Sequence, residues 1–366
     1  MMIRRLVPVA LFAAFGLLSV GPVSAADAVA DFYKGKTVTI SVGYTPGGGY
    51  DVYTRAVARY IGKHIPGNPN IIVQNMPGAG SRLAANWLYN VAPKDGTAWA
   101  VIGENSALDQ ALKEEGVNFD VAKFNWIGNP IADSNVTFVN ASTGIVSLED
   151  QINKGGAICG GTGASSPSIL QPTILNNLLN AKIKIVTGYP GGGDVNLAME
   201  RNEVNCRGSN SWASTKSTTR QWIEERKINI LVQFSVRKDP EISAYMKRDV
   251  PLITDLAKNE IDRKALAALV AGTAFGRPIL TAPGVPEARV AALRKAFDDT
   301  MKDAAFVEET SKAKMDLNPV GGAELQKVAQ SSVAIDDGVI KRVRELIQIK
   351  DLQDAPAQPK GAKKGG

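Results

Sequence analysis

The sequence predicts an α/β protein whose two domains flank a central cleft. Its 366 residues exceed the usual size of a single hydrophobic core. From residue 37 onward, short apolar strand patterns alternate with helical patterns, as in a mainly parallel sheet with helices on both faces. The alternation starts again after "VTFVNAS" (136–142), which indicates a second domain.

The first repeat is a β-α-β-α-β unit. Val38, Ile40 and Val42 alternate with polar residues, as in a strand with one buried face. Apolar residues between Val52 and Ile61 recur at helical spacing and form the stripe of the first helix. The predicted elements are a strand at 37–43, a helix at 52–61, a strand at 70–76, a helix through 83–88 and a strand at 97–103.

The second repeat has the same order of elements. Apolar side chains between Ile169 and Leu179 recur with helical spacing, so this stretch is expected to be a helix with a buried face. The predicted elements are a strand at 156–160, a helix at 168–180, a strand at 182–189, a short helix, the segment 203–210 and a strand at 229–236.

Helices dominate the rest of the chain. We expect them at 263–272, at 286–303 with Pro286 in the first helical position, at 306–315, and in a last long helix ending near Ile349. These helices have no sheet of their own, so they must pack on a domain that already exists.

The most economical course for the chain is to leave domain I near Ile131, build domain II, and return near Val236. Domain I is then 27–131 plus 236–354, and domain II is 132–235. Two passages of the chain form a hinge, and sites in such sheets lie beyond the carboxyl ends of the strands. The tail 355–366 is rich in Pro, Gly, Lys and Ala and is expected to be disordered.

The N-terminal leader predicts export. Two arginines precede an apolar run at 6–20, and small residues follow as far as Ala26. This pattern is typical of a secretory signal peptide, here 1–26. A membrane anchor is the alternative, but the run is shorter than the ~20 residues of a bilayer span and contains Pro8. We therefore expect a periplasmic protein without stable membrane insertion.

The net charge of +6 does not indicate nucleic-acid binding. Five of the positive charges lie in the leader and the tail, so about +1 remains for the folded part. The positions concerned are Arg4, Arg5, Lys360, Lys363 and Lys364.

Cys159 and Cys206 are the only cysteines. In an oxidising compartment they can form a disulfide, and the alternative is two buried thiols at strand ends. A bridge would close a loop of roughly 47 residues and stabilise the fold by about 4 kcal/mol through loop entropy.

Two glycine-rich loops are candidates for anion binding. In "YTPGGGYD" (44–51), three glycines without Cβ atoms open a helix, and Asp51 is expected to be its N-cap. In "GGTGASSPS" (160–168), Ser166 is expected to be the N-cap before Pro167, and hydroxyl groups can donate to ligand oxygens. Free backbone N–H groups and the helix dipole at both places favour a carboxylate or a phosphate.

Neither loop contains a lysine or an arginine, so N–H and hydroxyl groups are expected to supply the whole stabilisation of a bound anion. The similar segment "YPGGGD" (189–194) is interpreted as another loop whose residues favour the start of a helix. Either a simple turn or a loop that lines the cleft fits it.

Catalytic and metal-binding motifs are missing from the sequence. It has no GxxxxGK[ST] loop, no GxSxG motif and no metal-ligand spacing, so we expect no enzyme activity, cofactor or metal. The single histidine, His64, is expected at the surface or near a helix end. Glu104 follows a strand and is expected to be a solvated loop carboxylate, with a place in the cleft as the alternative.

Several segments together resemble the Bug-type extracytoplasmic receptors of tripartite tricarboxylate transporters. They are "VGYTPGGGYDVYTRAVARYI", "VQNMPGAGSRLAANWL", "APKDGTAWAVIG", "IVTGYPGGGDVNLAMERNEVNC", "VPLITDLA" and "APGVPEARVAALRKAF". The sequence departs from the family pattern at Ser81, where a second glycine is common, and at Tyr50, where the family often has a smaller residue.

The resemblance implies a type II periplasmic-binding-protein fold, a pair of α/β domains that close like a Venus flytrap. It also implies a carboxylate ligand held by the first loop of each domain, here 44–51 and 161–168. The candidate ligand-binding residues are Tyr44, Pro46, Gly47, Gly48, Gly49, Asp51, Asn105, Thr162, Gly163, Ala164, Ser165, Ser166 and Tyr189.

The leading hypothesis is a monomeric binding protein that delivers a mono-, di- or tricarboxylate to membrane transporter subunits. A receptor that reports carboxylate availability to a sensor kinase is a second hypothesis. An enzyme on the same scaffold is a third, which the lack of a catalytic set disfavours.

Overall fold

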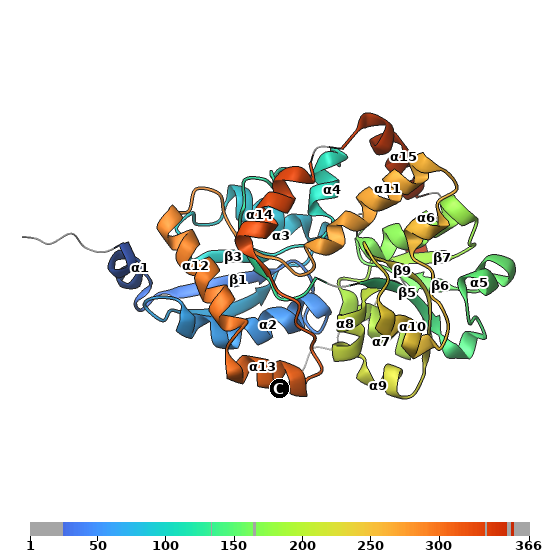
Figure 1. Cartoon of the computed structure of the whole chain (residues 1–366), viewed down its shortest axis with the longest axis horizontal. Helices are drawn as coiled ribbons and strands as arrows, with labels where there is room; N and C mark the ends of the chain where they lie inside the picture. Colours follow the sequence, from blue (N-terminus) through green and yellow to red (C-terminus); the bar gives the residue numbers. More distant parts are fainter. Residues whose placement is uncertain (1–24, 133, 164–165, 334, 350–352, 355–366) are drawn as a thin grey trace, which may run out of the picture.

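The computed structural model describes residues 25–354 except 133, 164–165, 334 and 350–352 (Figure 1). The predicted signal peptide, apart from its last two residues, and the predicted disordered tail lie outside the described residues. Within the described ranges, no helix is both long enough and apolar enough to cross a bilayer.

The first sheet has six strands in the order β11-β4-β10-β3-β1-β2. The strands β1, β2 and β3 run parallel, as predicted. The strand β10 lies between β3 and β4 and is antiparallel to both, and β11 pairs antiparallel with β4 at the edge of the sheet. Their bounds are β1 (Thr37–Val42), β2 (Asn70–Asn75), β3 (Ala98–Val101), β4 (Asn125–Asn129), β10 (Ile279–Thr281) and β11 (Val320–Gly321).

Helices cover the first sheet because apolar stripes on them meet the buried strand residues. Val38 and Ile40 of β1 are fully buried against Val57 and Ile61 of α2 in one core cluster. The helices of this half are α1 (Ala25–Tyr33), α2 (Gly49–Ile61), α3 (Arg82–Asn90), α4 (Ser106–Ala111), α12 (Glu287–Thr300), α13 (Ala304–Lys312) and α14 (Gly322–Ser331). Pro286 is the N-cap of α12 rather than its first residue.

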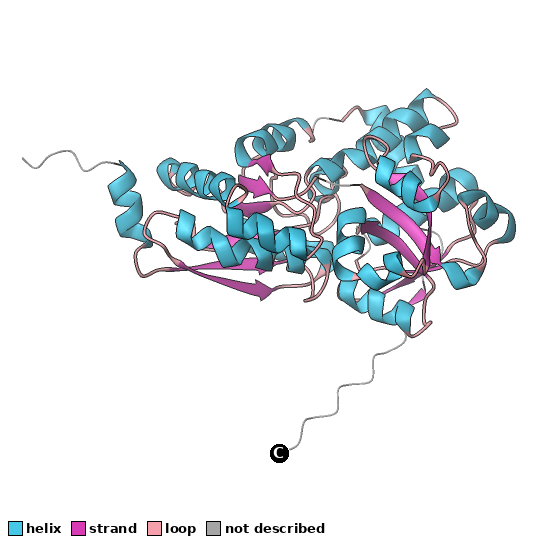
Figure 2. Cartoon of the chain, turned by 60° about the horizontal axis from the view of Figure 1, so that its bottom comes forward, coloured by secondary structure: helices cyan, strands magenta, loops and turns pink. Residues whose placement is uncertain are grey.

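The second sheet has six strands in the order β12-β7-β6-β8-β5-β9. The strand β6 lies parallel to β7 and β8, and β5 runs antiparallel between β8 and β9. Figure 2 shows the two groups of strands apart from each other, each among helices. The bounds are β5 (Asn135–Asn140), β6 (Ile158–Gly160), β7 (Lys184–Thr187), β8 (Cys206–Ser211), β9 (Ile228–Phe234) and β12 (Gln353–Asp354).

The helices of the second half include elements that the sequence assigned to the first. Ile253, Leu266 of α11 and Leu346 of α15 are buried in one cluster with Leu175 of α6. Figure 1 shows α11 and α15 beside α6. The helices are α5 (Leu148–Lys154), α6 (Pro167–Leu179), α7 (Gly192–Glu200), α8 (Trp212–Thr218), α9 (Arg220–Glu224), α10 (Pro240–Met246), α11 (Glu260–Ala271) and α15 (Asp337–Ile347).

The return to the first sheet therefore falls between α11 and β10, later than the predicted Val236. The predicted long last helix is two helices, and a third passage of the chain leads from α14 on the first half to α15 on the second. Helical periodicity shows that a stripe is apolar but not which sheet covers it. We propose revised domain bounds in which 132–271 and 337–354 form the second domain.

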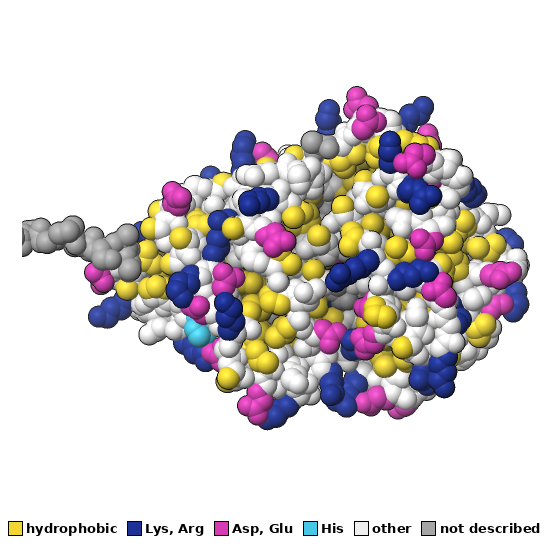
Figure 3. Space-filling model, viewed as in Figure 1, with side chains coloured by type: hydrophobic (Ala, Val, Ile, Leu, Met, Phe, Trp, Pro, Cys, Tyr) yellow, Lys and Arg dark blue, Asp and Glu magenta, His cyan; other side chains and the backbone are white. Residues whose placement is uncertain are grey.

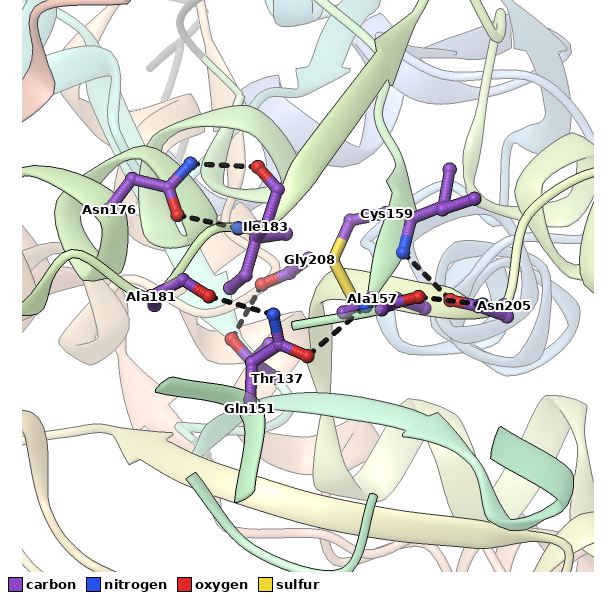
Figure 4. The surroundings of a disulfide bond; sticks show 12 residues. Thr137, Gln151, Ala157, Cys159, Asn176, Ala181, Ile183, Asn205 and Gly208 are labelled. Atoms are coloured by element: carbon purple, nitrogen blue, oxygen red, sulfur yellow. Dashed lines mark hydrogen bonds between the residues drawn. A yellow bond between two sulfur atoms is a disulfide. The ribbon is translucent and has the colours of Figure 1, made fainter. Parts of the chain in front are cut away.

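The disulfide between Cys159 and Cys206 is confirmed. The two residues are direct partners on the neighbouring strands β6 and β8, with their Cα atoms 4.1 Å apart. Side-chain amides hold the surrounding backbone, and Figure 4 shows Gln151 and Asn205 beside the bridge. Gln151 accepts from the N–H of Ala157 at 3.1 Å, and Asn205 accepts from the N–H of Ile158 at 2.7 Å.

The surface carries charges of both signs. Figure 3 shows Lys and Arg side chains interspersed with Asp and Glu on the visible face, rather than gathered in a basic stripe. That face does not present the basic stripe that is typical of nucleic-acid-binding proteins.

Candidate ligand-binding cleft

The candidate site is a cleft between the two sheets, at the ends of their parallel strands. Tyr44 follows β1 and Glu104 follows β3, whereas Thr162 follows β6 and Gly192 follows β7. The cleft contains a cavity of about 80 Å³. This is the position in which open α/β sheets bind ligands.

The helices α2, α6, α7 and α8 begin at the cleft. Their first turns contribute Gly49, Ser168, Gly192 and Ser214 to its wall. Ser166 is the N-cap of α6 and accepts from the N–H of Ser168, with Pro167 in the first turn, as predicted. Each helix N-terminus adds a partial positive charge, which favours an anion in the cleft.

The glycine-rich loops of the two halves lie against each other across the cleft. A Cβ atom on Gly191 would overlap Oγ1 of Thr45, and one on Gly193 would lie 3.0 Å from the carbonyl oxygen of Pro46. A Cβ atom on Gly163 would overlap the backbone of Gly80. The repeated glycines therefore allow the backbones of the two halves to approach closely. The interpretation of these loops as helix starts did not include this contact.

Asp51 is not the N-cap of α2, which is Gly48. It lies inside the first turn, is buried, and does not line the cleft. Its Oδ2 atom accepts from the N–H of Gly47 at 3.0 Å, and its Oδ1 atom accepts from Arg55 and Asn75, each at 2.9 Å. Asp51 thus holds the shape of the loop through these contacts.

Two tyrosines form an aromatic wall. The rings of Tyr44 and Tyr50 stack with centroids 4.5 Å apart and an interplanar angle of 21°. The Tyr44 hydroxyl donates to the carbonyl of Gly80 at 3.3 Å, and the Tyr50 hydroxyl accepts from the N–H of Glu104 at 3.3 Å. Burial raises the pKa of both hydroxyls, so both stay neutral donors at physiological pH.

Arg207 is a cleft residue that sequence reasoning missed. It stands in β8, directly after Cys206, and is only 5% exposed. Its guanidinium donates to the carbonyl of Gly192 at 3.1 Å and to Oδ1 of Asn210 at 2.9 Å, and its buried Nε has no hydrogen-bond partner. Burial lowers the pKa of Arg207 to about 10, so it remains a cation at neutral pH.

Arg277 is the second missed arginine, also 5% exposed, and it precedes β10 on the other side of the cleft. Its guanidinium lies 4.8 Å from the ring centroid of Tyr53 and 5.8 Å from that of Tyr50, and it donates to the hydroxyl of Ser214. Its buried Nε also lacks a partner. The signals that could have found them are an arginine directly after a cysteine in the segment 203–210, and an arginine between Gly276 and Pro278.

Glu104 lies in the cleft wall, so the expectation of a solvated loop carboxylate is wrong. It is 7% exposed and accepts a hydrogen bond from the side-chain amide of Asn135 on β5. The contact joins the two halves of the molecule, because Glu104 follows β3 of the first sheet.

Some of the other predicted ligand-binding residues line the cleft, and the rest lie around it. Tyr44, Gly48, Gly49, Thr162 and Ser166 line the cleft. Pro46, Gly47 and Gly163 lie in the loops behind it, Asn105 is the N-cap of α4, and Tyr189 is buried in a core cluster of the second half. Ala164 and Ser165 lie outside the described residues. Across the described ranges, no group of His, Cys, Asp and Glu could hold a metal ion.

Solved structures show the same architecture. The periplasmic binding protein BugD superposes with a TM-score of 0.67 and 17% identity, covering 86% of this chain and 98% of its own. MatC from Rhodopseudomonas palustris, solved with bound malate, gives 0.63 and 18%, covering 86% of this chain and 99% of its own. An R. palustris protein solved with adipate gives 0.64 and 16%, covering 85% and 97%.

This chain has the fold of the periplasmic binding proteins. The predicted type II architecture is thereby confirmed, and the resemblance to Bug-type proteins is confirmed at the level of the fold. BugD is described as a periplasmic binding protein, and MatC was solved with a carboxylate, malate, in place.

Comparison of sequences finds a match over a smaller part of this chain. A UPF0065 protein of Cupriavidus necator is 33% identical over 128 residues, which is 35% of this chain and 38% of that relative. The match thus spans little more than a third of the curated relative's length. No family model matches the chain.

Proposed function

We propose that the chain is an extracytoplasmic solute-binding protein that captures a small carboxylate in the cleft and delivers it to a tripartite tricarboxylate transporter. The observation that carries the proposal is the cleft itself. Four helix N-termini and two buried guanidinium groups line it, against the single carboxylate of Glu104, so positive groups predominate in a cavity between two halves that can close on a ligand.

The carboxylate class is supported by hydrogen-bond chemistry. The wall offers hydroxyls of Thr162, Ser166 and Ser209 besides the guanidinium donors. Donors to an anionic oxygen contribute about 1.5–3 kcal/mol each, so a few of them suffice for micromolar affinity, about 8.2 kcal/mol. The likeness to proteins solved with malate and adipate points to the same ligand class.

A thermal-shift screen against small carboxylic acids, each paired with its neutral amide, tests the binding function. An acid at 100 times its dissociation constant should raise the free energy of unfolding by about 2.7 kcal/mol, and the matching amide should have no effect. If no acid shifts the transition while the folded protein is intact, the carboxylate function is wrong.

Uptake of a labelled acid by cells with and without the gene tests delivery. We expect uptake to be lost with the gene and restored by the full-length chain. If uptake persists but the transcriptional response to the acid disappears, the chain serves a sensor kinase instead. Mass spectrometry of the exported protein should find the N-terminus near Ala26 and no retained Met1.

A further inference from the structure

The cleft wall carries an unusual set of charges for a site predicted to work through backbone groups. Among the described residues that line it, the charged side chains are Arg207, Arg277 and Glu104. The two guanidinium groups come from opposite halves, since Arg207 belongs to the second sheet and Arg277 precedes a strand of the first.

Arg207 is a buried cation whose hydrogen-bond partners among the described residues are neutral. A guanidinium has five N–H donors, and the neutral oxygens of Gly192 and Asn210 occupy two of them. Removing a cation from water is costly unless an anion compensates for it, so this arrangement is complete only with an external anion.

Arg277 repeats the arrangement on the facing side. Its neighbours are a hydroxyl, Ser214, and the faces of Tyr50 and Tyr53, all of which are neutral. Aromatic faces orient a guanidinium and stabilise it in part, but they leave its in-plane N–H groups available for a carboxylate.

The cavity limits the size of the ligand. A buried water needs about 10–15 Å³ of such space, so the volume of about 80 Å³ corresponds to roughly five to eight water molecules. A four-carbon diacid, with eight non-hydrogen atoms, occupies a comparable space, whereas a tricarboxylate such as citrate is considerably larger.

We propose that Arg207 and Arg277 form a two-point site for a compact dicarboxylate, with one carboxylate paired to each guanidinium. The proposal rests on the proposed function and names its ligand class and charge partners. A dianion held in this way links the two halves directly, so binding and closure of the cleft are coupled. Glu104 is a like charge that restricts where the two carboxylates can lie.

Calorimetry with succinate, its half-amide succinamate, and butyrate tests the two-point site. These ligands have nearly the same length and differ in the number of carboxylates. We expect succinate to bind about 100-fold more tightly than either of the others, as is typical for the loss of one partner from a buried charge pair.

Arg207→Gln and Arg277→Gln should each reduce the affinity for succinate about 100-fold. Their effect on the affinities for succinamate and butyrate should be smaller. Arg207→Lys and Arg277→Lys keep the charge and should retain part of the preference for succinate. Arg248→Gln is the matched control, since Arg248 is a partly buried arginine whose guanidinium donates to backbone carbonyls outside the cleft. Arg248→Gln should leave the affinity for succinate unchanged.

Urea unfolding separates a binding defect from misfolding. Without ligand, both Arg→Gln variants should be at least as stable as the parent, because each removes a buried charge that lacks an anion. Glu104→Gln should bind succinate several-fold more tightly, because the like charge is gone. The proposal is overturned if wild-type protein binds butyrate as tightly as succinate, or if both Arg→Gln variants bind succinate as tightly as the parent. Absence of binding to every carboxylate would instead contradict the proposed function.

Discussion

Asp51 organises the binding loop without touching the cleft. Its carboxylate connects the N–H of Gly47, the guanidinium of Arg55 and the amide of Asn75. Asn75 also donates to the carbonyl of Tyr44 at 2.8 Å, so one network fixes both ends of the loop. Burial alone would raise the pKa of Asp51, but these hydrogen bonds outweigh it and lower the pKa.

Asp51→Asn should therefore show a pH-dependent loss of stability. Since the folded-state pKa lies below the unfolded value of about 3.9, the stabilisation is fully present above that value and is lost as the pH falls through the folded pKa. We expect a loss of about 1.5–3 kcal/mol at pH 7 that shrinks toward pH 3. Urea unfolding of both proteins at several pH values measures it, and a constant difference would contradict the assignment.

Gly191 tests the close approach of the two loops. Its φ of −161° is extended backbone that any residue adopts, so alanine there strains nothing within its own half. The added Cβ atom overlaps Thr45, which belongs to the other half of the molecule. Gly191→Ala should thus weaken ligand binding at least about tenfold, or 1.4 kcal/mol, with little change in unfolding without ligand. Gly321→Ala, at the open N-cap of α14, is the control and should bind normally.

At the scale of elements, the disulfide ties β6 to β8 beneath the cleft. The strand β8 carries Arg207 immediately after Cys206, and Thr162 follows β6, so the bridge supports wall residues of the second half. Its two ends are separated by 47 residues, which restricts the unfolded chain considerably.

The Cys159→Ala/Cys206→Ala variant should lose about 4 kcal/mol in free energy of unfolding. The loop-entropy argument places the effect in the unfolded chain, so the folded structure and ligand affinity should change little. Urea unfolding with and without reductant measures it. The parent should be sensitive to reductant and the variant insensitive, and equal stability of the two under oxidising conditions would rule out the bridge as a stabilising element.

At the scale of the whole molecule, polar contacts join the two halves across the cleft. Thr45 donates to Oδ2 of Asp194 at 2.7 Å, and Lys216 of α8 forms an ion pair of 2.5 Å with Asp316 of the first half. The pair is partly exposed, so it contributes roughly 0–1 kcal/mol. We therefore expect this ion pair to add little to closure and a bound ligand to add more.

Small-angle X-ray scattering should show a smaller radius of gyration when ligand is added. Lys216→Met removes one closing contact and should lower affinity by no more than about fivefold, consistent with a contribution below 1 kcal/mol. Lys238→Met is the control, because its ion pair with Asp249 lies within the second half. An unchanged radius at saturating ligand would contradict a closing cleft.

The alternating patterns determined the parallel strands β1, β2 and β3, because their apolar residues and glycine-rich turns are local signals. Cap chemistry likewise determined Ser166 and Pro167 at the start of α6, and the even cysteine count allowed the disulfide. Only the tertiary structure decided that α11 and α15 pack on the second sheet, since an apolar stripe fits either surface. It alone brought Arg207 and Arg277, 70 positions apart in the sequence, to one cavity. No local sequence pattern predicts this pairing. A guanidinium group needs an anionic partner only when it is buried, and the whole fold determines which residues are buried.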